Sequence, residues 1–261
     1  MSNIVHLFTP GVDSFVSDWM LNTTTHTDKI TRVYFNTGCR YSDIEDQFLV
    51  NTRDRSYFYT DFSLTMGDIE HEDAHIPNRN LLFISMAQAR YNADIIYING
   101  VKDDNVSDNT FSFYNKISKL LSDISGKPVL VESKTINYEK SECCKKYTDS
   151  APEEDKYRIL TDTYSCFSNN LERHSVDVHR INDNDRFEIV KYMTISGCLK
   201  CPACFRKMCA LTHANIFIPF NNADIINTYF NRVNSGNMDH TPIRKSTIIK
   251  AKNFLNWYAT K

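Results

Sequence analysis

Short apolar runs alternate with helix-like patterns through the first half of the chain. Strand-like runs occupy residues 4–8, 32–35, 56–64, 93–99 and 128–131. Apolar residues at helical spacing lie between them, at residues 15–21, from residue 42 onward, at 79–90 and at 115–121. Strands that alternate with helices predict an α/β fold, a doubly wound parallel sheet with helices on both faces. Ser42 and Glu45 have the spacing of a capping box, which predicts a helix start at Ser42.

The pattern changes after residue 131. Helices are predicted at residues 139–147, 186–192, 205–214, 222–233 and 245–258. Residues 151–155 are predicted to form a loop, and residues 169–185 are polar. We therefore expect two domains, 1–165 and a mainly helical C-terminal region at 166–261, whose surface could also serve a homodimer.

Three cysteines, Cys198, Cys201 and Cys204, are each separated from the next by two residues. Tight turns at this spacing direct several sulfur atoms to one point, which is typical of a zinc site. A structural zinc ion takes four ligands, so a fourth must come from elsewhere in the chain. The triplet therefore predicts that the C-terminal region is braced by Zn²⁺.

Composition excludes some classes of function. The net charge is −2 and charged residues make up 24% of the chain, which gives no electrostatic case for a nucleic-acid or membrane partner. No segment approaches the roughly 18 consecutive apolar residues of a membrane helix. The first residues also lack the pattern of a secretory signal, so we expect a cytoplasmic protein with reduced cysteines.

The turn from Thr9 to Ser14 follows the first predicted strand and opens a helix. It offers backbone N–H groups and two hydroxyls at a helix N-terminus, where phosphate binds favourably. Gly11 permits close approach of a ligand to the backbone. The turn lacks the Gly-Lys-Ser/Thr ending of a Walker A loop. A tight turn in which Asp13 caps the helix explains the same residues equally well.

Several motifs resemble, in the same order, those of the N-type ATP pyrophosphatases, and among them the 7-cyano-7-deazaguanine synthases. The Thr9–Ser14 turn resembles their Ser-Gly-Gly-x-Asp-Ser loop. The similarity covers roughly residues 3–209. The other segments that carry it are Gly38–Tyr41, Ile76–Phe83, Asn99–Val101, Glu139–Glu142 and Thr163–Cys166, followed by the cysteine triplet.

This resemblance implies an adenine nucleotide alpha hydrolase-like, Rossmann-like fold and an ATP-dependent ligase. Such an enzyme converts 7-carboxy-7-deazaguanine, with ammonia, to the amide and then the nitrile through an adenylated intermediate. Its cofactors would be ATP with Mg²⁺ and a structural Zn²⁺. The product would serve queuosine synthesis or another deazaguanine modification of nucleic acid, without direct binding of nucleic acid.

The resemblance also implies roles for individual residues. The fourth zinc ligand would be Cys166, with His174, His179 and Cys209 as rivals. The histidines are otherwise expected to be solvated loop residues, and Cys209 a buried helix residue. The residues implied to bind ATP are Thr9, Gly11, Val12, Asp13, Ser14 and Gly100. Those implied to act in catalysis are Asp13, Ser14, Arg79 and Lys140, and those implied to bind the substrate are Arg40 and Asp108.

The chain departs from the family pattern at two places. Thr9-Pro10 replaces Ser-Gly, which removes one N–H donor from the loop. Residues 109–112 replace a Cys-Arg-Pro-Glu segment near the substrate. Two alternatives therefore stay open. One is another ATP pyrophosphatase that modifies tRNA or transfers sulfur, which the Asn36-Thr37-Gly38 sequence favours. The other is a catalytically silent, zinc-braced binding protein.

Overall fold

The computed structural model describes residues 2–24, 30–53, 55–72, 75–104, 106–168, 170–235 and 241–261. The chain divides into two compact units, Met1–Glu139 and Lys140–Lys261. The boundary lies earlier than the predicted division at residue 166. The reason is that α5 (Lys140–Ser150) packs against α7 (Pro202–Thr212) within the second unit.

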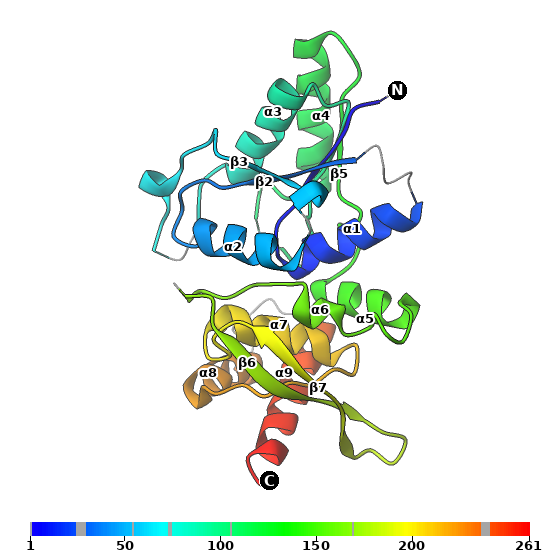
Figure 1. Ribbon diagram of the computed structural model, residues 1–261, viewed down its shortest axis with the longest axis vertical. Helices are drawn as coiled ribbons and strands as arrows, with labels where there is room; N and C mark the ends of the chain where they lie inside the picture. The colour runs from blue at the N-terminus through cyan, green and yellow to red at the C-terminus, as the bar shows by residue number, and fades with distance from the viewer. Residues whose placement is uncertain are drawn as a thin grey trace. The chain divides into compact units, whose positions relative to one another are not determined.

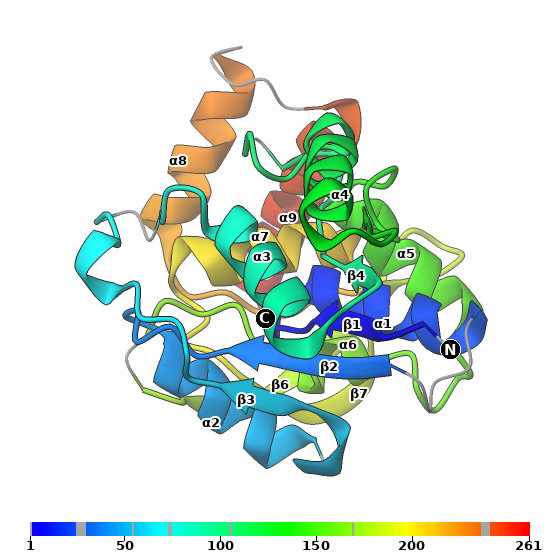
Figure 2. The same cartoon turned by 90° about the horizontal axis from the view of Figure 1, so that it is seen from above.

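A five-stranded parallel sheet forms the centre of the first unit (Figure 1). Its strand order is β3-β2-β1-β4-β5, so β2 lies between β1 and β3 (Figure 2). From β1 the chain continues to β2 and β3 on one side of β1, and then crosses to form β4 and β5 on the other side of β1. The strands are β1 (Ile4–Leu7), β2 (Ile30–Phe35), β3 (Tyr59–Asp61), β4 (Ile95–Tyr97) and β5 (Leu130–Glu132).

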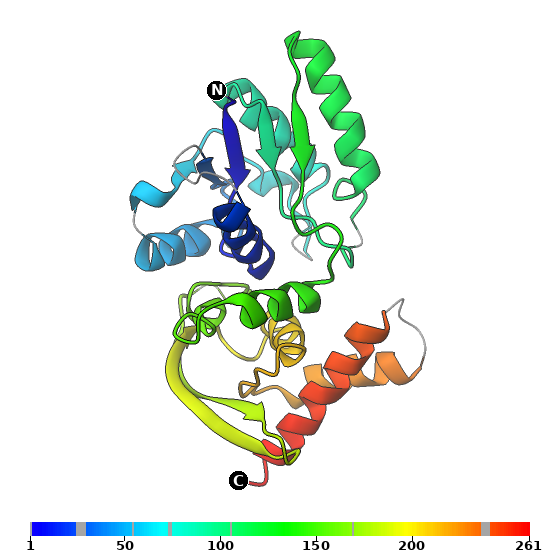
Figure 3. The ribbon, with the colours of Figure 1, turned by 90° about the vertical axis from the view of Figure 1, so that its right-hand side faces the viewer.

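Helices cover both faces of this sheet, which confirms the predicted α/β fold class (Figure 3). Two helices, α1 (Val12–Thr24) and α2 (Ser42–Thr52), lie on one face. The other face carries α3 (Arg79–Tyr91) and α4 (Phe111–Ser125). Two short 3₁₀ helices, η2 (Arg55–Tyr57) and η3 (Gly67–Ile69), lie before and after β3.

Alternation along β1 divides the core between the two faces. Val5 and Leu7 pack with Ile84 of α3 and Ile117 of α4. Ile4 instead packs with Leu21 of α1. Because both faces are covered, β1 is apolar on both sides except at His6, and the sequence shows it as a nearly continuous apolar run.

The predicted capping box at Ser42 is wrong. The helix α2 begins at Ser42 itself, after Tyr41, and no side chain caps it. The Ser42 hydroxyl pairs with the Thr37 hydroxyl at 3.2 Å, and the Glu45 carboxylate accepts a hydrogen bond from Tyr34 at 3.0 Å. Both side chains are engaged by β2 and the turn after it, so neither is available to the helix start.

The second unit contains a long antiparallel hairpin that the sequence did not predict. Its strands are β6 (Arg173–Ile181) and β7 (Phe187–Ser196). The predicted helix at residues 186–192 is therefore wrong, because these residues pair with β6. Four of the remaining elements are helical, as predicted: α5, α7, α8 (Ala223–Asn234) and α9 (Pro242–Tyr258). The short helix α6 (Arg158–Thr161) was not predicted. In the part of the chain that the structure describes, no helix has the length and apolar character needed to cross a membrane.

Gly100 sits in a tightly packed turn after β4. Its carbonyl accepts hydrogen bonds from the hydroxyls of Ser133 at 2.7 Å and Thr135 at 2.9 Å. A Cβ at this position would overlap the Tyr114 hydroxyl and would lie 2.6 Å from Oδ1 of Asn109. The fold therefore requires a glycine here, whether or not the turn contacts a nucleotide.

We predict that Gly100→Ala lowers the free energy of unfolding by about 1–3 kcal/mol, because the added methyl group overpacks the turn. Urea denaturation measures this change. Gly11→Ala is the matched control, since its Cβ would make an ordinary 3.4 Å contact with Thr9 Oγ1. Equal destabilisation by both substitutions would contradict this account of Gly100.

Candidate nucleotide site and metal centre

The Thr9–Ser14 loop connects β1 to α1 and is held by its own hydrogen bonds. The Thr9 N–H donates to the buried Ser14 hydroxyl at 2.9 Å, and the Gly11 N–H reaches Thr9 Oγ1 at 3.4 Å. The first amides of α1, which starts at Val12, have no acceptor within the helix. A loop at a helix N-terminus can offer an anion backbone N–H groups and the positive end of the helix dipole.

Asp13 lies in the first turn of α1. A carboxylate here repels a bare anion but suits a complex of phosphate with a divalent cation, since Mg²⁺ binds carboxylate and phosphate oxygens together. The residue types in the loop therefore fit a magnesium–phosphate ligand better than phosphate alone.

Arg40 follows β2 and is engaged by the segment around η3. Its backbone N–H donates to the Glu70 carboxylate at 2.8 Å. Its guanidinium donates to the carbonyls of Glu72 at 3.1 Å and His71 at 3.3 Å. In this structure the predicted substrate residue Arg40 thus holds a neighbouring loop in place.

Arg79 and Asp108, predicted for catalysis and substrate binding, lie close together at the start of α3. Arg79 is exposed, and the buried Asp108 accepts hydrogen bonds from the Asn80 backbone at 3.0 Å and the Asn80 side chain at 3.2 Å. Burial raises the pKa of Cys39, and the Arg79 charge partly offsets that rise. The first unit thus places the Arg79 charge near Cys39, in the turn after β2, and the Asp108 carboxylate against the start of α3.

Lys140 is the first residue of α5 and belongs to the second unit. The residues predicted for catalysis are therefore divided between the units: Asp13, Ser14 and Arg79 lie in the first unit, and Lys140 lies in the second. The residues predicted to bind ATP all lie in the first unit: Thr9, Gly11, Val12, Asp13, Ser14 and Gly100.

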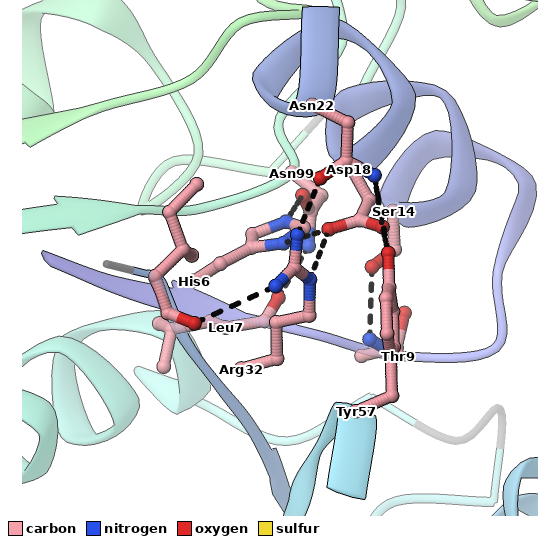
Figure 4. Close-up of polar contacts among 10 residues, drawn as sticks. His6, Leu7, Thr9, Ser14, Asp18, Asn22, Arg32, Tyr57 and Asn99 are labelled. Carbon is pink, nitrogen blue, oxygen red and sulfur yellow. Dashed lines mark hydrogen bonds and ion pairs between the residues drawn. The ribbon is translucent and has the colours of Figure 1, made fainter. Parts of the chain in front are cut away.

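A buried polar cluster below the loop was missed by sequence reasoning. Asp18, one turn after Ser14 in α1, accepts a hydrogen bond from Arg32 Nε at 2.6 Å and another from the Tyr57 hydroxyl (Figure 4). Its Oδ1 atom also lies 3.3 Å from Nδ1 of His6. His6, Asp18 and Arg32 are all buried. The signal in the sequence was a histidine within an otherwise apolar strand.

The cluster extends across the sheet to the end of β4. His6 Nε2 lies 2.8 Å from Asn99 Oδ1, and the Asn99 amide donates to the carbonyl of Leu7 (Figure 4). Burial by itself would raise the pKa of Asp18, but hydrogen bonding to His6 and the charges of His6 and Arg32 outweigh it. The pKa of Asp18 is therefore held well below its usual range, and the group is a carboxylate.

Four cysteine thiols form a compact cluster in the second unit. The Sγ atoms of Cys166, Cys198, Cys201 and Cys204 all lie within 4.8 Å of one another. Four sulfur ligands at such distances fit a tetrahedral zinc ion and leave no position for water or substrate. This donor set fits the implied structural Zn²⁺ and supports Cys166 as the fourth ligand.

The hairpin explains how Cys166 reaches the triplet. Cys166 precedes β6 and Cys198 follows β7. Arg173, the first residue of β6, pairs with Ser196, the last residue of β7. Antiparallel pairing therefore brings the end of β7 back beside the start of β6, and with it Cys198 near Cys166. The Cys198 N–H donates to Cys166 Sγ at 3.2 Å, and the Cys204 N–H donates to Cys201 Sγ at 3.4 Å. Such N–H···S bonds stabilise thiolates.

Two further residues, Gly197 and Lys207, lie close to the cysteine cluster. Gly197 has a φ of +129°, and a Cβ there would lie 3.2 Å from Cys204 Sγ. Lys207 on α7 donates to the carbonyl of Thr163 at 2.8 Å, just before Cys166. Burial lowers the pKa of Lys207 to about 8, and the Cys204 charge opposes that shift.

The rival zinc ligands lie outside the cluster. His174 and His179 both belong to β6, so the expected loop position is wrong for both; His174 is partly exposed, whereas His179 is buried. His179 is 2% exposed and packs at ring-centroid distances of 5.2 Å from Phe254 and 5.4 Å from Trp257. Cys209 is buried in α7, as expected.

Comparisons with known proteins give little detail. No protein-family model and no curated protein sequence matches the chain. Among solved structures, the chain is similar to a predicted subunit of tRNA methyltransferase from Methanocaldococcus jannaschii. The identity is 12% and the TM-score 0.40, over 55% of this chain and 73% of that one. A likeness this distant does not indicate an activity.

We predict that the purified protein contains one zinc ion per chain and that Cys166→Ser loses most of it, because three thiolates leave the site open. Elemental analysis measures the metal. Chelation should also unfold the second unit, since metal binding contributes to folding. Cys39→Ser, in the first unit, and His174→Ala should retain the zinc. Full zinc content in Cys166→Ser would contradict the assignment.

We predict that Asp18→Asn lowers the free energy of unfolding by about 3–5 kcal/mol at neutral pH, because His6 and Arg32 lose their buried partner. Since the pKa of Asp18 is depressed from 3.8, its contribution is complete above that value and is lost as the pH falls below it. Denaturant titration at several pH values measures both effects. Asp94→Asn, in the surface pair with Lys127, is the control and should change little. Equal effects of the two substitutions would contradict the assignment.

Proposed function

We propose that this chain is an ATP-dependent enzyme of the N-type ATP pyrophosphatase kind. It would cleave ATP between the α and β phosphates and transfer AMP to a carboxylate substrate. The observation that carries this proposal is the position of the Thr9–Ser14 loop, which leads from β1 into α1 at the centre of the sheet.

The strand order supports this position. After β1 the chain moves to one side of the sheet, and β4 lies on the other side, so the connections diverge between β1 and β4. Ligands of open α/β sheets bind outside the carboxyl ends of the strands at such a point. The Thr9–Ser14 loop follows β1, and the Gly100 turn follows β4.

The residues in this region suit adenylation. A carboxylate resists attack by ammonia because its leaving group is poor, and transfer of AMP supplies a better one while pyrophosphate leaves. The loop amides and the Ser14 hydroxyl would bind the polyphosphate, and Asp13 would hold Mg²⁺, which offsets phosphate charge. Arg79 would stabilise the phosphate or the substrate carboxylate.

We further propose 7-carboxy-7-deazaguanine, or a related deazapurine acid, as the substrate, with ammonia as the nucleophile. The support is the ordered series of motifs from Thr9 to Cys204, together with Arg79 and Asp108 at the start of α3. The closed four-cysteine site would be structural in this enzyme.

A second candidate is an ATP pyrophosphatase that modifies tRNA or transfers sulfur. Cys39 favours it, because this partly exposed thiol follows the Asn36-Thr37-Gly38 turn and lies near Arg79. The two candidates share ATP and differ in the acceptor.

The first test compares two serines of the same helix. Ser14→Ala should weaken ATP binding and slow pyrophosphate release by about tenfold or more, because a phosphate-loop hydroxyl is lost. Ser17→Ala should leave both unchanged, since the Ser17 hydroxyl is buried and makes no hydrogen bond within the described part of the chain. Calorimetry and a pyrophosphate assay measure these quantities. A wild-type protein that binds no ATP would contradict the proposal.

The second test identifies the acceptor. Mass spectrometry of 7-carboxy-7-deazaguanine incubated with protein, ATP, Mg²⁺ and ammonium should show the amide and the nitrile, together with AMP. Unchanged acid would contradict the deazapurine proposal. Cys39→Ser separates the candidates, because it should leave nitrile synthesis intact but should abolish a sulfur transfer that depends on the thiol.

A further inference from the structure

The hydrogen bonds of Asn99 fix one proton of His6. The Asn99 side-chain amide meets the Leu7 carbonyl, which can only accept a hydrogen bond, so the NH₂ group must face Leu7. The Asn99 oxygen therefore faces His6 Nε2 at 2.8 Å. Because that oxygen also only accepts, His6 Nε2 must carry a proton.

The surroundings of Asp18 fix the second proton. Asp18 accepts hydrogen bonds from Arg32 Nε at 2.6 Å and from the Tyr57 hydroxyl, as a carboxylate does. His6 Nδ1 lies 3.3 Å from the same Oδ1 atom that Arg32 contacts. A lone pair on Nδ1 would face a carboxylate oxygen and be repelled. Each ring nitrogen of His6 thus has an acceptor oxygen beside it, which is the arrangement that an imidazolium, with a proton on each nitrogen, satisfies.

With His6 protonated, the cluster of His6, Asp18 and Arg32 carries a net positive charge. Two basic side chains then face a single carboxylate, and all three side chains are buried. Tyr57 contributes a neutral hydroxyl, and its ring lies 4.3 Å from the Arg32 guanidinium.

The positive cluster lies directly behind the Thr9–Ser14 loop. Asp18 follows Ser14 by one turn of α1, about 6 Å along the helix axis. His6 precedes the loop on β1, and Figure 4 shows the cluster beside the Thr9–Ser14 hydrogen bond. A buried charge is poorly screened, so its field reaches a ligand in the loop.

We propose that His6 is an imidazolium, and that the His6–Asp18–Arg32 cluster thereby provides a fixed positive charge beneath the Thr9–Ser14 loop and strengthens the binding of polyphosphate groups. This inference rests on the proposed function and deepens it. His6 and Arg32 act through the loop without touching the ligand and are positioning residues. The Pro10 position lacks an N–H donor, and the buried charge compensates for that loss.

The protonation of His6 is tested first, on the unmodified protein. Long-range ¹H–¹⁵N NMR distinguishes an imidazolium from either neutral tautomer. The expected result is a His6 ring with both nitrogens protonated at neutral pH. A neutral His6 ring would overturn the inference, whatever the protein does with ATP.

The effect on binding is tested with charged and uncharged ligands. His6→Gln keeps a donor toward Asn99 but removes the charge. It should weaken ATP and pyrophosphate binding about tenfold, on the scale of one unit charge within a protein. Adenosine, which has no phosphate, should bind it as it binds the wild type. Arg32→Gln, the second variant, should behave in the same way.

Lys127→Gln is the matched control, because it removes one positive charge from the surface of the same unit, beside Asp94. It should bind ATP like the wild type. Equal losses of ATP and adenosine binding in His6→Gln would mean a distorted site and overturn the inference. Unchanged ATP binding in that variant would overturn this inference and leave the proposed function standing. A wild-type protein that binds neither ATP nor pyrophosphate would overturn both.

Discussion

The buried carboxylate of Asp18 joins the elements around the Thr9–Ser14 loop. Through its hydrogen bonds it connects α1 to β1, β2 and η2, and through His6 and Asn99 it reaches the end of β4. The loop depends on the relative positions of β1 and α1, which these contacts fix. An apolar side chain at this position would pack the helix but would not determine the orientation of its neighbours so closely.

The second unit depends on a different constraint, the convergence of four thiols. Antiparallel pairing of β6 with β7 brings Cys166 beside Cys198, so the residues between them do not separate the ligands. Two of the four cysteines lie at the N-terminus of α7, where Cys201 is the cap residue and Cys204 lies in the first turn. A helix N-terminus favours negative charge, and four thiolates around Zn²⁺ carry a net negative charge. A structural metal here would add its binding free energy to the stability of the second unit.

The sequence predicted the first unit well because its signals are local. The apolar runs of β1 and β4 and the helical spacing of α3 reflect burial on both faces of a sheet, which a single segment shows by itself. Residues 186–192 were predicted wrongly as a helix, since strand pairing with residues 173–181 is not visible in either segment alone. The burial of His179 depends on Phe254 and Trp257, far along the chain. The Asp18 cluster likewise depends on contacts between separate elements.

The candidate site was predicted only in part, because some of its signals are local and others depend on tertiary contacts. The thiol triplet has a fixed spacing that can be recognised directly in the sequence. The position of Asp108 against the start of α3 depends instead on its contact with Asn80.

The central claim is that ATP is cleaved between its α and β phosphates to activate a carboxylate. Exchange of labelled pyrophosphate into ATP tests this claim most directly. The account predicts exchange that requires the carboxylic acid substrate and Mg²⁺. Release of ADP and inorganic phosphate without exchange would contradict it.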